Sequence, residues 1–284
     1  MSHLYLGYDP GGGGAHGVAA IDGKNVFCDT LVTAQSAIDW FRERCRERDG
    51  IALGVDTLTL WSSGPAGWRP ADRALRAAYA DVANSVTAPN SLYGSMPISG
   101  AVVIRTLSET IKGLRVTETH PKVLYFALTG HLYNYEHEAM GMIQNLSEWI
   151  GLGDLNVNSE HAWDALVSAY AARQWVTQDW RADLHQLQSN EDETLVPVCG
   201  NQSYYVWPYP IALAGRIHAH EATVPSPRGR DRWRVAVERL QQAGHHDVAQ
   251  QIEKYRNARN KRAGWDAWLR SNFPALWAIY KTED

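Results

Sequence analysis

The sequence has few cysteines and no long apolar run, and both features limit what the protein can be. Cys28, Cys45 and Cys199 show no CxxC or Cys/His ligand spacing, so neither a disulfide framework nor a zinc site is indicated. No stretch approaches the ~20 apolar residues that a membrane span requires. The start MSHLYLGYDP also lacks the regions of a secretion signal. We therefore expect a cytoplasmic protein with no membrane partner.

The chain as a whole also lacks a strong excess of charge of one sign, but residues 1–209 and 210–284 differ in net charge. The formal net charge is −4 overall, with +5 over residues 210–284 and −9 over residues 1–209. This asymmetry is consistent with an acidic body that gathers metal and a basic tail that contacts phosphate. A solvated helix face is the simpler explanation of the basic tail.

The first half of the chain has the pattern of a mixed sheet. LYLGYD and GVAAID flank the glycine run 11–14, which predicts a hairpin. NVFCDTL predicts a third strand, followed by a helix from Thr33 to about Arg48. IALGVDT is typical of a buried parallel strand that ends at Asp56. ADRALRAAYADVAN and residues 99–113 predict helices, and LRVTETHP predicts another strand.

The second half is mainly helical. NSEHAWDALVSAYAARQWV is the strongest helical pattern, with Ser159 as its expected N-cap. Short strands are expected around VPVCG and YYVWPYPIAL. These patterns predict a catalytic domain over residues 1–180, an irregular or strand-containing extension and linker over 181–228, and a basic helical segment over 229–284.

Three acidic residues mark the ends of predicted neighbouring strands. Asp9, Asp56 and Glu118 end the first, fourth and fifth strands, so one edge of the sheet should bring them together. Carboxylates gathered in this way repel one another unless a cation is bound between them. Hard oxygen ligands suit Mg²⁺ or Mn²⁺.

The late helix adds two candidates to this site. His161 and Asp164 are three residues apart and share one helix face. We expect Asp9, Asp56, Glu118 and Asp164 to hold metal, with His161 as a ligand or proton carrier in two-metal phosphodiester hydrolysis.

Each candidate except Asp164 also has an ordinary structural explanation. Asp9 could close a turn, Asp56 could cap one, Glu118 could face solvent and His161 could end a helix. An unpaired carboxylate at Asp164, within an apolar helix, would be costly without a metal.

Two segments resemble known nucleases. GYDPGGGGAHGVAAI resembles the first hairpin of Holliday-junction resolvases of the RuvC type, and HAWDAL resembles the helical segment that completes their active site. The resemblance places Asp9, Asp56, His161 and Asp164 on metal-binding positions.

The family of predicted ribonuclease H-like nucleases catalogued as domain of unknown function 429 is more similar in order and spacing. The shared features include VDT, RPADRALR, TETHPKVLYFALTG and DALVSA, and they cover most of residues 3–175. This resemblance implies that Glu118 and His120 belong to the site region and that Asp72, Arg73 and Arg76 line its approach.

We accordingly take Arg69, Arg73, Arg76 and His120 as candidate substrate contacts. The three arginines could instead pair with Asp72 and solvent on a helix face.

The expected fold class is α/β, with a ribonuclease H-like mixed sheet of antiparallel hairpins and parallel strands flanked by helices, and a helical C-terminal extension. The expected function is that of a divalent-metal-dependent nuclease, a hydrolase of DNA or RNA. The alternatives are an actin- or sugar-kinase-like phosphotransferase and a non-catalytic nucleic-acid-binding module. The expected partner is nucleic acid, and a protein that positions the basic tail is a second candidate partner.

Overall fold

The structure is a computed structural model whose described residues all belong to one compact unit within Met1–Gly215. The described residues are 3–11, 14–63, 67–87, 95–187, 195–198 and 202–211. The predicted basic helical segment 229–284 and the linker after residue 211 lie outside them.

A six-stranded sheet with the order β3-β2-β1-β4-β6-β9 forms the centre of the unit. Neighbouring strands among the first three are antiparallel, and β1, β4, β6 and β9 run parallel to one another. The strands are β1 (Leu4–Pro10), β2 (His16–Asp22), β3 (Asn25–Leu31), β4 (Ile51–Val55), β6 (Arg115–Glu118) and β9 (Ser203–Tyr204). This is the mixed sheet that the sequence predicted, so the ribonuclease H-like fold class is confirmed.

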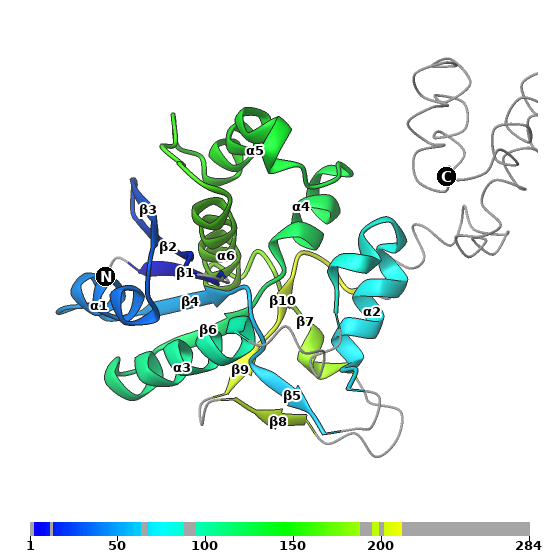
Figure 1. Cartoon of the computed structure of the whole chain (residues 1–284), viewed down its shortest axis with the longest axis horizontal. Helices are drawn as coiled ribbons and strands as arrows, with labels where there is room; N and C mark the ends of the chain where they lie inside the picture. Colours follow the sequence, from blue (N-terminus) through cyan, green and yellow to red (C-terminus); the bar gives the residue numbers. More distant parts are fainter. Residues whose placement is uncertain are drawn as a thin grey trace, which may run out of the picture. The chain divides into compact units, whose positions relative to one another are not determined.

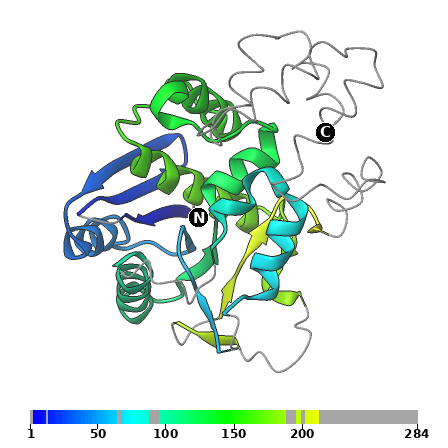
Figure 2. The same cartoon turned by 45° about the vertical axis from the view of Figure 1, so that its right-hand side comes forward.

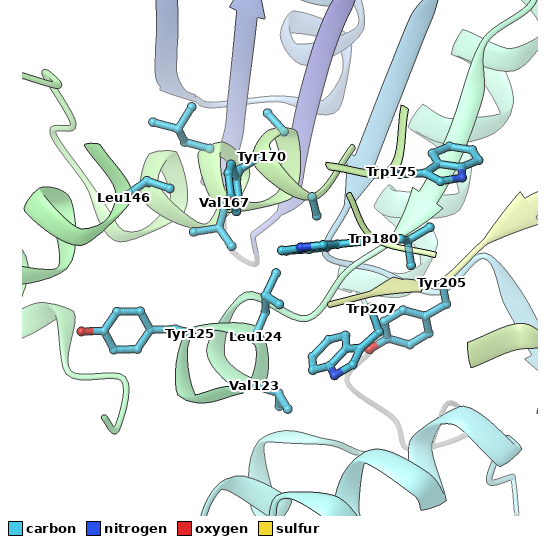
Figure 3. Packing of buried hydrophobic residues seen from close by; sticks show 14 of the residues in the cluster. Val123, Leu124, Tyr125, Leu146, Val167, Tyr170, Trp175, Trp180, Tyr205 and Trp207 are labelled. Carbon is cyan, nitrogen blue, oxygen red and sulfur yellow. The ribbon is translucent and has the colours of Figure 1, made fainter. Parts of the chain in front are cut away.

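Helices cover both faces of the sheet (Figure 1). On one face lie α1 (Ala34–Arg44) and α3 (Ser95–Thr110), which pack against alternate strand residues such as Leu6 and Tyr8. On the other face lie α4 (Pro121–Thr129), α5 (Tyr135–Ile150) and α6 (Glu160–Val176). Figure 3 shows the apolar packing around α6. Burial on both faces explains why β4 is apolar at nearly every position.

The predicted N-caps of two helices are present. The Thr33 side chain accepts a hydrogen bond from the backbone N–H of Ser36, and the Ser159 side chain accepts one from Ala162. The prediction of a single helix over ADRALRAAYADVAN is wrong. Instead, α2 (Pro70–Ala78) has Tyr79 as its C-cap, and the 3₁₀ helix η1 (Ala80–Ser85) follows.

Short elements complete the unit beside the β6–β9 side of the sheet (Figure 2). β5 (Leu60–Ser62) pairs with β8 (Leu195–Pro197), and β7 (Ala182–Asp183) pairs with β10 (Val206–Trp207), with η2 (Leu184–Gln186) after β7. The described part of the predicted extension 181–228 therefore contributes β9 to the main sheet and a fully buried Trp207 to the core.

Helix α6 lies in direct backbone contact with the sheet. A Cβ atom added to Gly7 on β1 would lie 1.7 Å from the carbonyl oxygen of Ala165, and one added to Gly54 on β4 would lie 1.9 Å from that of Ser168. The same holds for Gly17 on β2, 1.9 Å from the carbonyl oxygen of His161. Glycines on three adjacent strands thus allow one helix to rest on the strands themselves.

Among the described helices, none is both long and apolar enough to cross a lipid bilayer.

The close contact predicts a severe effect of one methyl group. We expect Gly7→Ala to lower the free energy of unfolding by about 3 kcal/mol or more, because the new Cβ meets rigid backbone rather than a movable side chain. Gly141→Ala is the control, since nothing lies within 4 Å of its Cβ position in α5. It should stabilise by roughly 0.5–1 kcal/mol. Urea unfolding measures both, and equal effects would contradict the packing argument.

Candidate active site

The glycine contacts of α6 determine which polar side chains meet. Two residues beyond Gly7 along β1 is Asp9, and one helical turn before Ala165 is His161. Two residues along a strand and four along a helix both advance by about 6–7 Å. The contact therefore places Asp9 beside His161.

The same relation holds on the next strand. Gly54 rests on Ser168; Asp56 lies two residues beyond Gly54, and Asp164 lies one turn before Ser168. The backbone N–H of Asp56 donates to the Tyr8 carbonyl oxygen at 2.9 Å, which holds Asp56 alongside β1. The structure thus gathers Asp9, Asp56 and Asp164, which we call the aspartate site, with His161 next to it.

Asp9 and His161 form a direct pair. Nδ1 of His161 donates to Oδ2 of Asp9 at 2.6 Å. This hydrogen bond raises the pKa of the imidazole, while burial raises the pKa of the Asp9 carboxyl despite the imidazole beside it. Gly11 permits the arrangement, because a Cβ there would lie 2.7 Å from the His161 ring.

Among the described residues, no histidine pairs with Asp164 or Asp56 as His161 pairs with Asp9. Burial, followed by the charge of Asp9, raises the pKa of both carboxyl groups well above the ordinary range. Asp56 also raises the pKa of Asp164. The Tyr133 hydroxyl donates weakly to Oδ2 of Asp164 at 3.4 Å. The buried Oδ1 of Asp164 has no hydrogen-bond partner among the described residues, which is unfavourable for a charged oxygen.

A lysine that the sequence reasoning missed lies beside these acids. Lys122, the second residue of α4, pairs with Glu160 at 3.2 Å and lies 4.8 Å from the centre of the Tyr133 ring. Burial lowers the pKa of Lys122, but the charges of Asp164, Glu160 and Asp56 together raise it above its ordinary value. The position of Lys122 directly after the predicted His120-Pro121 segment was the available signal.

Glu118 lies in a different electrostatic environment from the three aspartates. Its carboxylate accepts hydrogen bonds from both terminal nitrogens of the buried Arg69, and from the backbone N–H and hydroxyl of Thr59. Arg69 also binds Asp72 through two hydrogen bonds of 2.7 and 2.9 Å. Arg69 and its hydrogen bonds hold the pKa of Glu118 far below its usual value, against the effect of burial. Glu118 is therefore already neutralised by protein groups.

The other three expected substrate contacts, Arg73, Arg76 and His120, lie in different surroundings. Arg76 donates to the carbonyl oxygens of Ala83 and Val86 and so supports η1. Arg73 is exposed and borders a shallow hollow on α2. Nε2 of His120 donates to the Ser85 carbonyl oxygen at 3.0 Å, and burial lowers the pKa of this imidazole. Their role in substrate binding stays a prediction.

A pocket of about 390 Å³ opens beside the aspartate site. Asp56 and Lys122 belong to its wall, and the Arg69–Glu118 pair also lines it. We call it the side pocket.

Oxygen donors of the aspartate site match the preference of Mg²⁺ or Mn²⁺. Within the described ranges, no group of three or more His, Cys, Asp or Glu side chains is placed so that it could hold a metal ion. The fit to a cation rests instead on the unpartnered Oδ1 of Asp164 and on the mutual repulsion of the aspartates.

The sequence matches no family model and no curated protein. A solved structure of RuvC from Thermus thermophilus aligns with 62% of this chain and 96% of its own, at 16% identity and a TM-score of 0.34. A TM-score this low does not establish a shared fold, so the fold class is assigned from the strand order and directions described above.

The repulsion within the aspartate site predicts a pH-dependent stability in the presence of chelator. Because the pKa of Asp164 is raised on folding, stability is lost as pH rises through the folded pKa. Asp164→Asn removes this loss and should raise Tm at pH 8, by about 2–4 °C for each kcal/mol relieved. The gain should shrink as pH falls. Thermal unfolding across pH checks it, with the exposed Asp154→Asn as the control; a variant less stable than wild type at pH 8 would contradict it.

The buried ion pairs of Arg69 predict a large loss of stability when the arginine is removed. Arg69→Met leaves Glu118 and Asp72 without their cation and should cost roughly 3–5 kcal/mol. Arg105→Met removes an exposed pair with Glu109 and should cost at most about 0.5 kcal/mol. Urea unfolding at pH 7 compares them. Similar losses would show that Arg69 is not the structural partner of Glu118.

Proposed function

We propose that the protein is a Mg²⁺- or Mn²⁺-dependent phosphodiesterase that acts on nucleic acid. The observation that carries this proposal is Oδ1 of Asp164, which is buried without a partner in the described part of the chain, beside two further aspartates. A protein gains no stability from such an arrangement. A divalent cation would convert the repulsion into attraction.

The ligands in this proposal are Asp9, Asp56 and Asp164. Glu118 was also expected to bind metal, but Arg69 and Thr59 already satisfy its oxygens. We therefore propose that Glu118 fixes the end of β6 and the loop after β4 by binding Thr59, while the aspartates face the cation.

Divalent cations held by Asp9, Asp56 and Asp164 would activate a water and stabilise the charge that develops in a phosphoryl displacement. The chain's own groups supply orientation and proton transfer. Asp9 holds His161 through Nδ1, which leaves Nε2 as the nitrogen able to take or give a proton. Lys122 places a positive charge where an anionic substrate must approach the aspartates.

The test is cleavage of labelled single-stranded, duplex and branched DNA, and of RNA, with Mg²⁺ or Mn²⁺. We expect products that disappear with chelator and fall by about 10²-fold or more in Asp164→Asn, as typical for loss of a group at the reacting centre. The exposed Asp154→Asn should cleave as wild type does.

Metal binding is measured separately by the shift of Tm with Mg²⁺ or Mn²⁺. Wild type should gain stability with metal, and Asp164→Asn should gain far less. Cleavage that persists unchanged in Asp164→Asn, or an equal metal-induced shift in both proteins, would overturn the proposal.

A further inference from the structure

We propose that the side pocket receives the base and sugar of one unpaired nucleotide, so that single-stranded nucleic acid is the preferred substrate. This inference rests on the proposed function, because it places the nucleotide next to the phosphodiester that the aspartate site would cleave.

The first argument is position. Asp56 belongs to the aspartate site and to the pocket wall, and Lys122 of α4, which lies beside the aspartates, also lines the pocket. A ligand whose phosphate lies at these two residues therefore has its neighbouring organic part at the mouth of the pocket. No other group of the substrate is so close to the reacting phosphate as the attached nucleoside.

The second argument is size. The pocket volume of about 390 Å³ lies near the lower end of the range for small-molecule sites. It has room for one base with its sugar and none for a paired helix. A base in a duplex would have to leave its stack and its partner to enter, which costs energy that a single strand does not pay.

The third argument is the chemistry of the wall. Leu58, Val86 and Met96 supply apolar surface from three separate segments, as a flat ring requires. His120 adds a ring held in place by its hydrogen bond to Ser85. Because a carbonyl oxygen can only accept, Nε2 carries the hydrogen of this bond. Apart from Asp56 and Lys122, the charged lining groups of the described wall are the mutually paired Arg69, Asp72 and Glu118.

The first experiment measures binding with the full-length protein. Saturation-transfer NMR and calorimetry with AMP, UMP and inorganic phosphate, each with and without Mg²⁺, compare wild type with Met96→Trp. Met96 is partly buried in the wall, so the indole should fill the pocket. Ile98→Trp is the matched control, because Ile98 lies on the same helix, 67% exposed and outside the wall.

We expect Met96→Trp to lower mononucleotide affinity by about tenfold or more, as for loss of base contacts elsewhere. Phosphate binding should stay unchanged, and Ile98→Trp should match wild type. Absence of mononucleotide binding by wild type, or equal binding by Met96→Trp, would overturn the inference.

The second experiment compares cleavage of a single strand with cleavage of the same sequence in a duplex. Wild type should prefer the single strand, and Met96→Trp should lose most of that preference. Equal cleavage of both substrates by wild type would overturn the inference but would be compatible with the proposed nuclease function. If instead no substrate is cleaved, and Met96→Trp abolishes mononucleotide binding, the pocket is a nucleotide site and the proposed nuclease function is overturned.

Discussion

The contact between α6 and the sheet is the constraint on which the rest of the structure depends. Glycines on three adjacent strands let the helix backbone rest on the strand backbone, at Gly7 and Gly54 most directly. Any side chain at these positions would raise the helix and carry His161 and Asp164 away from the strand ends. The core around α6 and the aspartate site therefore have the same origin, and the glycines serve the site by their lack of a side chain.

The acids of the unit fall into two electrostatic classes. Glu118 and Asp72 share the buried guanidinium of Arg69, and this compensation makes them part of the framework. Among the described residues, Lys122 is the cation that lowers the pKa values of Asp56 and Asp164, but burial and the charge of Asp9 keep both pKa values high. Carboxylates whose charge is balanced by an arginine are expected to be structural, whereas buried carboxylates with strongly raised pKa values are candidates for a functional site. This contrast separates residues that the sequence pattern placed in one group.

The wall of the side pocket depends on these same structural pairs. Its wall is built by segments that the framework holds: Arg76 supports the end of η1, His120 joins η1 to the start of α4, and Arg69 with Glu118 lines it from within. Arg69, Arg76 and His120 thus support the wall of the side pocket, while their contact with substrate stays a prediction. Because Asp56 lines both the side pocket and the aspartate site, the nucleotide that we propose for the pocket would have its phosphate beside the aspartates.

The sequence by itself determined strands β1 to β4 and β6, most helices and the caps Thr33 and Ser159, because strand alternation, helix periodicity and capping are local properties. It also placed Asp9, Asp56, His161 and Asp164 near one sheet edge. It did not predict β5 or β7. The break at Tyr79 and the joining of β9 to the sheet were decided only by tertiary structure. So were the neutralisation of Glu118 by Arg69, 49 residues apart, and the place of Lys122 beside the aspartates. Each depends on which distant side chain fills the space next to a charge, and no local pattern encodes that.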